Sequence, residues 1–242
     1  LPILGEPVIV HMLRRVARAR SLDALWLATG DDAANDPLAA AVTSAGFQVF
    51  RGSEGDPLDR FHALATRERA DVVVRLTGDC PLHDPAVIDH VVQRYLAEAP
   101  QRVYGSNILP PTYPDGLDTE VFEYSALDAV ARTSTNKLEH DHVTMGIHRQ
   151  HHRDADKPPI VNVLGPADFS HLRWTLDYPS DYEFIRRVYE TLHPTNPEFG
   201  WLDVVALQTR QPELLDYAKA HERNANVMAE VAAGGLDGQG RP

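Results

Sequence analysis

The sequence has one cysteine and a deficit of cations, and each scarcity excludes a class of protein. Cys80 is the only cysteine in 242 residues, which excludes an intramolecular disulfide and a cysteine-rich zinc site. The chain carries 23 Lys and Arg against 35 Asp and Glu, a formal charge of −12. That balance argues against a broad surface for nucleic acid or for an anionic membrane. A polyanionic ligand must therefore meet a local cation or a metal ion.

Long apolar runs are also missing. No stretch approaches the roughly 18 to 20 apolar residues that span a bilayer, and no basic segment precedes an apolar one as in a signal peptide. We therefore expect a cytoplasmic protein. The length suits one α/β domain, for which we predict residues 1–232, with a disordered tail over 233–242.

The first half of the chain alternates helical and strand patterns. Apolar spacing predicts helices over 7–19 and 56–69 and strands over 24–30, 47–52 and 70–79. Such alternation is typical of an α/β protein with a parallel sheet covered on both faces.

The regular alternation of strand and helix patterns ends at a proline-rich segment, where the second half of the chain begins. Strand patterns follow over 118–124, 159–164 and 172–176, a helix is predicted over 180–192, and the chain is helical from Gly200. We interpret this half as an α+β elaboration of the same domain.

Two aspartates directly follow strand-like segments. Asp79 ends the run VVVRLTGD, and Asp177 ends LRWTLD. Ligands of parallel α/β sheets bind at the carboxyl ends of strands, and Mg²⁺ prefers one or two carboxylates with substrate phosphate oxygens. Asp79 and Asp177 are therefore candidate metal ligands, although a strand-end aspartate also serves as a turn or helix cap. Asp181 is a competitor of Asp177 that suits a first helical turn.

The segment YPDGLDTEVF (113–122) concentrates acidic residues around Gly116. A PDG turn needs no function. Asp118 and Glu120, however, share one strand face, where two like charges are costly unless a cation pairs with them.

Histidines and arginines supply further candidates. Five histidines lie between 140 and 152, but their spacing does not suit a zinc site, and only His142 is a candidate for a substrate contact. Arg51 and Arg60 could bind phosphate or carboxylate through two hydrogen bonds each. Arg75 lies within a predicted strand, and we expect its side chain to bind a structural partner within the protein.

Six stretches together resemble the spore coat polysaccharide biosynthesis protein F family, a branch of the cytidylyltransferases that includes CMP-KDO and CMP-acylneuraminate synthetases. They span about residues 1–190, in the family's order: LPILGEPVI, FRGSEGDPLDR, DVVVRLTGDCPLHDP, YPDGLDTEVF, EHDHVT and HLRWTLDYPSDYEFI. TGDCPL and YPDGLD are specific in combination. The resemblance implies a Rossmann-like, GT-A-like nucleotidyltransferase fold, a mixed sheet with helices on both faces.

The resemblance also implies roles for the candidates. Asp79 and Asp177 are at the positions of the Mg²⁺ ligands of the CMP-sugar synthetases. The resemblance therefore implies that they are the catalytic pair. Residues in the region that holds the nucleotide are Arg51, Ser53, Asp59, Arg60, Thr77 and Gly78, and those near the sugar are Asp115, Gly116, Asp118, Glu120 and His142. Homodimers are common among relatives.

The resemblance departs at the front of the chain. Family members begin with a central strand and a glycine-rich, basic loop that wraps the triphosphate, whereas this sequence opens after that loop. We expect the first strand to be missing, through truncation or a misassigned start codon, and its neighbours to lack ladder partners.

The sequence thus predicts transfer of a cytidylyl group from CTP to an acidic or phosphorylated sugar with release of pyrophosphate. Two alternatives stay open. One is a GT-A-like glycosyltransferase that uses the same metal-binding carboxylate with a nucleotide-sugar donor. The other is a non-catalytic homologue that lacks the phosphate loop but keeps the fold.

Overall fold

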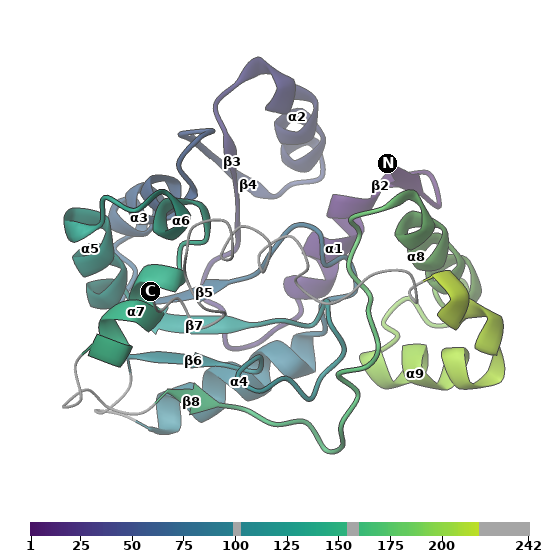
Figure 1. The fold of residues 1–242 in the computed structure, drawn as a ribbon. Helices are drawn as coiled ribbons and strands as arrows, with labels where there is room; N and C mark the ends of the chain where they lie inside the picture. The colour runs from purple at the N-terminus through teal and green to yellow at the C-terminus, as the bar shows by residue number, and fades with distance from the viewer. Residues whose placement is uncertain (99–102, 154–159, 218–242) are drawn as a thin grey trace.

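The computed structural model describes residues 1–98, 103–153 and 160–217, and shows two main sheets and a short two-stranded hairpin with helices around them (Figure 1). The predicted tail over 233–242 lies outside the described residues. Within these ranges, no helix is long and apolar enough to cross a membrane.

The larger sheet has four strands in the order β5-β7-β6-β8. Its strands are β5 (Val72–Arg75), β7 (Glu120–Glu123), β6 (Tyr104–Ser106) and β8 (Val161–Asn162). β7 is antiparallel to both of its neighbours, and β6 is parallel to β8. The sheet is therefore mixed, as the family resemblance implies, and not the parallel sheet that strand and helix alternation predicts.

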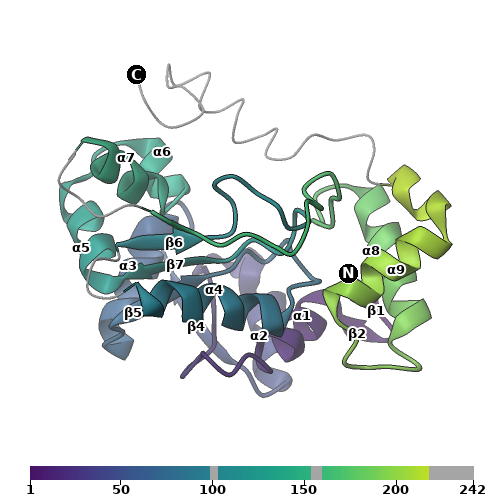
Figure 2. The same cartoon turned by 90° about the horizontal axis from the view of Figure 1, so that it is seen from below.

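Helices cover both faces of this sheet, because its strands alternate apolar side chains between two cores. Val121 of β7 joins the core that contains α1 (Val8–Val16), α4 (Pro85–Ala97), α8 (Pro179–Leu192) and α9 (Trp201–Arg210). Phe122 joins the second core, with α3 (Pro57–Glu68), α5 (Tyr124–Thr133) and α7 (Met145–Arg153). Figure 2 shows α4 crossing one face of the sheet. α4 comes so close to β6 that a Cβ on Gly105 would lie 2.8 Å from the Tyr95 ring.

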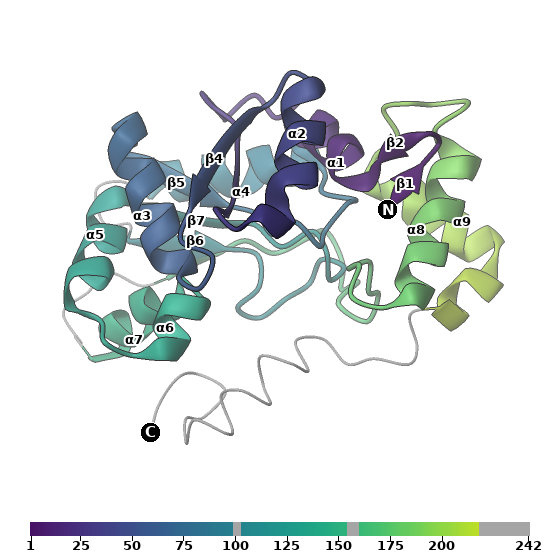
Figure 3. The same ribbon diagram turned by 90° about the horizontal axis from the view of Figure 1, so that it is seen from above.

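The second sheet is a parallel pair, β3 (Trp26–Gly30) and β4 (Gln48–Gly52), linked by the short helix η1 (Ala33–Asn35) and by α2 (Asp36–Ser44). In Figure 1 the pair stands above the larger sheet and crosses its strand direction, and Figure 3 shows it from above with α2 beside it.

The two sheets do not pair with each other. β3 pairs only with β4, and β5 only with β7, so each has one edge without a strand partner within the described ranges. Both strands line a cavity of about 1010 Å³.

The remaining elements are short. β1 (Pro2–Ile3) and β2 (Glu6–Pro7) form a hairpin beside α8, α6 (Lys137–Asp141) precedes α7, and η2 (Pro212–Tyr217) follows α9. The predicted strand over 172–176 is wrong: the segment is extended, but it forms only an isolated bridge between Arg173 and Asp115.

Candidate active site

The loop after β5 carries the first candidate carboxylate. Its turns are fixed by backbone bonds from Cys80 N to Thr77 O (3.3 Å) and from His83 N to Cys80 O (3.2 Å). Asp84 then begins α4 by accepting from the N–H groups of residues 86 and 87. This anchoring leaves Asp79 at the surface, where its side chain accepts a hydrogen bond from the Cys80 thiol at 3.5 Å.

The segment before α8 carries the second candidate. Arg173 donates to both carboxylate oxygens of Asp181, at 2.7 and 3.1 Å, and to Oδ2 of Asp177 at 2.5 Å. Thr175 also donates to Oδ2 of Asp177, at 2.8 Å. Asp181 is buried and accepts from the backbone N–H groups of 177 and 178, so it caps α8. Asp177 keeps about a third of its side chain exposed, and Oδ1 accepts no hydrogen bond from the described residues.

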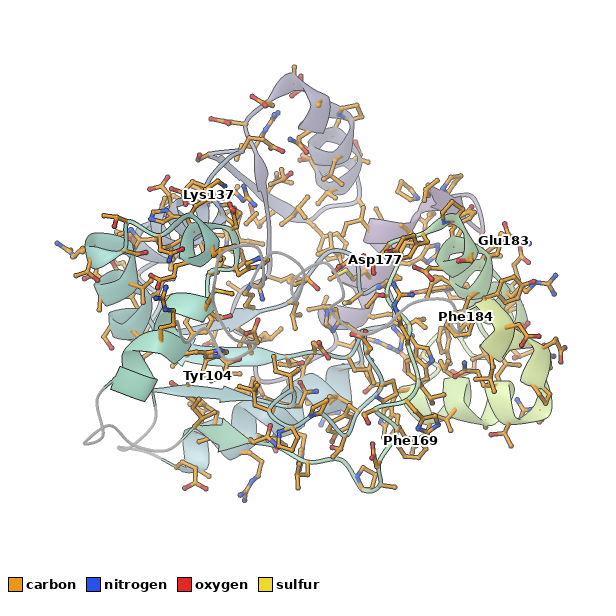
Figure 4. The ribbon with its side chains drawn as sticks, viewed as in Figure 1. Tyr104, Lys137, Phe169, Asp177, Glu183 and Phe184 are labelled. Carbon is orange, nitrogen blue, oxygen red and sulfur yellow. The ribbon has the colours of Figure 1, made fainter. Side chains whose placement is uncertain are left out.

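These two loops meet. The N–H of Leu176 donates to the carbonyl of Asp79 at 2.7 Å, so the peptide beside Asp177 is joined to the peptide of Asp79. Figure 4 shows Asp177 near the beginning of α8. The structure therefore brings the two predicted ligands to one side of the molecule, although they are 98 residues apart in sequence.

The 113–118 turn packs against the same segment. Asp115 N donates to Leu172 O at 2.9 Å, and Trp174 N donates to Asp115 O at 2.7 Å. Gly116 has φ +104°, and a Cβ there would lie 2.9 Å from the carbonyl carbon of Trp174, so both its conformation and its surroundings require glycine.

The thiol of Cys80 marks where the acidic side chains gather. Burial raises its pKa well above the ordinary value, and the carboxylates of Asp79, Asp118 and Asp115 raise it further. Asp79 contacts this buried thiol at 3.5 Å, the charges of Asp115 and Asp118 also act on it, and Asp177 lies one residue from the backbone contact to Asp79. We call Asp79, Asp115, Asp118 and Asp177 the acidic rim.

Glu120 is separate from this rim. Its side chain is buried, forms an ion pair with Arg75 across β5 and β7, and accepts hydrogen bonds from Tyr104 and Thr144, each at 2.7 Å. Burial opposes its ionisation, but Arg75 and these two hydrogen bonds outweigh burial and lower the pKa of Glu120. The expected cation for this acidic strand face is therefore Arg75. Since protein groups occupy both oxygens, the geometry does not favour the predicted contact between Glu120 and a sugar.

The predicted nucleotide residues divide into two groups. Arg60, Thr77 and Gly78 line the cavity between β3 and β5. Arg51 instead binds the loop after β3, through the carbonyls of residues 30 and 32 and the carboxylate of Asp36. The carbonyl of residue 53 accepts from Arg60 at 2.6 Å, and residue 59 lies in the first turn of α3. Whether Arg51, Ser53 and Asp59 contact nucleotide stays a prediction.

The described histidines of the 140–152 run have separate partners. His140 bonds to Asp56 at 2.7 Å and to the carbonyl of Ser134 at 3.2 Å, whereas His148 packs edge-on against Tyr104 with ring centroids 4.3 Å apart. His142 precedes Val143, which is buried with φ +46°. The described residues contain no cluster of three or more His, Cys, Asp and Glu side chains suited to a metal ion.

Sequence reasoning missed Val143 and Thr144. A positive φ at a β-branched residue is a conformational outlier, and nothing in the letters EHDHVT indicates it. Asp141 and Val143 line the cavity, and Thr144 donates to Glu120, so the α6–α7 turn links the cavity wall to the sheet. The pair of Thr144 with Glu120 spans 24 residues and has no sequence signal.

Comparison with solved structures defines the class first. A cytidylyltransferase from Leptospira borgpetersenii aligns with a TM-score of 0.81 and 25% identity over 88% of this chain and 87% of its own. A CMP:2-keto-3-deoxy-manno-octonic acid synthetase complexed with CTP aligns with a TM-score of 0.54 and 16% identity over 78% and 90% of the two chains, which is a likeness of fold. The fold is that of the α/β nucleotidyltransferases.

Sequence comparison then gives the family. The chain belongs to the cytidylyltransferase family, whose model matches residues 1–192. It is 30% identical to the spore coat polysaccharide biosynthesis protein SpsF of Bacillus subtilis, over 85% of this chain and 83% of that protein. The protein is therefore a nucleotidyltransferase.

Proposed function

We propose that this protein transfers the cytidylyl group of CTP to a hydroxyl of an acidic or phosphorylated sugar, for the synthesis of a surface polysaccharide. The sugar oxygen forms a bond to the α-phosphorus, the bond to the β-phosphate oxygen breaks, pyrophosphate leaves, and the hydroxyl proton is released. The observation that carries the proposal is the hydrogen bond between Leu176 and Asp79, which joins two carboxylate-bearing loops in a chain of this family.

The proposed cofactor is Mg²⁺, with Asp79 and Asp177 as its protein ligands. The donor set fits, because both carboxylates reach the surface and, among the described residues, the Asp79 side chain has only a weak thiol contact and one oxygen of Asp177 has no protein donor. When bound, the cation would offset charge developing on the α-phosphate and lower the pKa of the attacking hydroxyl. Arg173 and Thr175 hold Asp177 in a single orientation, which is the preorganisation that such a ligand needs.

The other roles follow from position. Arg60, Thr77 and Gly78 face the cavity and are proposed to hold the nucleotide, together with Arg51, Ser53 and Asp59. Asp115, Gly116 and Asp118 are proposed to face the sugar, with His142 beside them. Glu120 acts in this proposal by holding Arg75, not by touching the sugar.

A screen for pyrophosphate release tests the proposal. The four nucleoside triphosphates are combined with nonulosonic acids, KDO and sugar 1-phosphates in the presence of Mg²⁺. CTP with one acidic or phosphorylated sugar should release pyrophosphate, and EDTA should stop it. Release of a nucleoside mono- or diphosphate from a nucleotide sugar, without pyrophosphate, would indicate the glycosyltransferase instead. No rise of Tm with CTP and Mg²⁺ would indicate the non-catalytic homologue.

Three further properties belong to the same proposal: one domain over residues 1–232, a cytoplasmic location and a homodimer, the last drawn from the family. Light scattering on the purified protein tests the dimer, and limited proteolysis tests the domain, since a single domain should lose no internal fragment before its termini are trimmed.

A further inference from the structure

Arg75 stands at the end of β5, directly opposite Glu120 on β7. The two form an ion pair in which the glutamate is the more buried partner, since the exposed fractions of the side chains are 19% for Arg75 and 7% for Glu120. Arg75 lines the cavity, beside Thr77 and Gly78 of the loop that ends in Asp79.

Glu120 is fixed from the side opposite Arg75. Its Oε1 accepts from Tyr104 on β6 and from Thr144, while Oε2 accepts from Arg75. Thr144 is aimed at this oxygen by the α6–α7 turn, in which Val143 adopts its unusual φ. A strained turn persists only where its surroundings over-determine it, so the turn holds the carboxylate in one position.

Arg75 differs from the arginines that are used for structure. Arg15 donates to three backbone carbonyls, those of residues 82, 83 and 199, and Arg173 donates to two carboxylates. The guanidinium of Arg75 has a single hydrogen-bond partner among the described residues, Glu120. A guanidinium carries five N–H donors, so most donors of Arg75 remain available at the cavity wall.

Stability alone does not explain this pair. Burying two charges costs desolvation free energy, which their mutual attraction offsets only in part. Replacing such a pair by apolar side chains therefore often leaves the stability of the fold unchanged. Burial works against the charge of Arg75, but Glu120 outweighs it and raises the pKa of Arg75, so the cation persists at the cavity wall. In a protein with a charge of −12 and an acidic rim, such a cation is the local partner that a polyanionic ligand needs.

We propose that Arg75 binds an anionic oxygen of a substrate, on the phosphate of the nucleotide or on the acid group of the sugar, and that Glu120 positions its guanidinium for this contact. The inference rests on the proposed function, which supplies both anions. Arg75 is thereby a binding residue, while Glu120, Tyr104 and Thr144 act through it.

Two variants separate the guanidinium from the ion pair. E120Q removes the pair but keeps Arg75, and glutamine can still accept from Tyr104 and Thr144. R75M/E120Q removes the pair and the guanidinium together. R186M is the control variant: it removes one arginine from the surface of α8, away from the cavity. Calorimetric titration of the intact protein with CMP and with cytidine gives the preference for the phosphorylated ligand without requiring turnover.

We expect the parent and R186M to prefer CMP over cytidine to the same extent. E120Q should keep part of that preference, because it retains Arg75 but no longer positions it. R75M/E120Q should lose at least about tenfold of the preference, as for the loss of a hydrogen bond to a charged group. An unchanged preference, with a raised KM for the acidic sugar only in R75M/E120Q, assigns the contact to the sugar. If neither quantity changes, or if both variants lose the preference equally, Arg75 has only a structural role and the inference is overturned.

R75K keeps the charge but not the planar donor geometry, and provides the test should the double variant not fold. Its preference for CMP should fall between those of the parent and the double variant. The nucleotide measurement is independent of the sugar reaction. A chain that releases no pyrophosphate but prefers CMP through Arg75 would refute the proposed function and retain this inference.

Discussion

The four-stranded sheet and the β3–β4 pair have similarly apolar strands but differ in how deeply these strands are buried. Both contain apolar strands, yet β6 and the first three residues of β7 are fully buried, whereas β3 and β4 are mostly half-buried and contribute no residue to either core. The difference lies in what covers them. β7 and β6 are the inner strands of the larger sheet and have helices on both faces, whereas β3, like β5, turns one edge toward a cavity. Apolar composition specifies a strand, but only neighbouring elements bury it.

The largest expected effect lies in the loop that the larger sheet projects. D79N keeps the size of the side chain and removes a proposed metal ligand, so turnover should fall by at least about a thousandfold, the scale on which loss of one transition-state contact acts. Its Tm should match that of the parent, because the Asp79 side chain is exposed and, among the described residues, is bonded only weakly, to the Cys80 thiol. Pyrophosphate release and differential scanning fluorimetry measure the two quantities. E190Q, an equal loss of charge on α8, should leave both unchanged, and an active D79N would remove Asp79 from the catalytic pair.

Matched phenylalanine truncations test the comparison itself. Phe122 on β7 is 0% exposed, and F122A should lower the free energy of unfolding by about 3 to 5 kcal/mol. Phe50 on β4 is half-buried, with Arg67 4.9 Å from its ring centroid, and F50A should cost less than about 1.5 kcal/mol. Urea titrations of both variants against the parent give the values. Equal costs would mean that β4 is as well packed as β7 and would break the comparison.

The smallest effect concerns the contact between α6 and the start of α3. Burial disfavours the charged form of His140, but hydrogen bonds to Ser134 and Asp56 outweigh it and raise the pKa of His140 above the usual 6.5. A histidine whose pKa is raised by folding stabilises the folded state at pH values below about 6.5, its pKa in the unfolded chain. That stabilisation is lost as the pH rises through the higher folded-state pKa. H140Q should therefore be less stable than the parent by under about 1 kcal/mol at pH 5.5, and the difference should shrink towards pH 8.5 in urea titrations. A difference that grows with pH would contradict the assignment.

Much of the fold follows from local sequence patterns. The predicted helices over 7–19, 56–69 and 180–192 correspond to α1, α3 and α8, and the strands over 24–30, 47–52 and 118–124 to β3, β4 and β7. The predicted strand over 172–176 failed because its apolar residues pack as an extended segment against the 113–118 turn, with one bridge and no ladder. Periodicity reports which side chains are buried, but not whether the backbone finds a strand partner.

The site was predictable only in part. Strand-end position singled out Asp79, which follows β5, whereas Asp177 was singled out by a predicted strand that the structure does not contain, and both stay candidate ligands. The ties of Glu120 to Arg75, Tyr104 and Thr144 join four separate segments, so no local pattern specifies them. The acidic strand face did indicate that a cation must be present, but not which one.

The facing edges of β3 and β5 have a consequence for hydration. Backbone N–H and C=O groups that point away from β4 and β7 meet no strand across the cavity, and such groups need a partner even where the side chains around them are apolar. We expect water to supply it, so that these two cavity walls are hydrated although their side chains are largely apolar. Amide hydrogens on these edges should consequently exchange with solvent much faster than those in the β5–β7 ladder, a difference that lies in the backbone and not in the side chains.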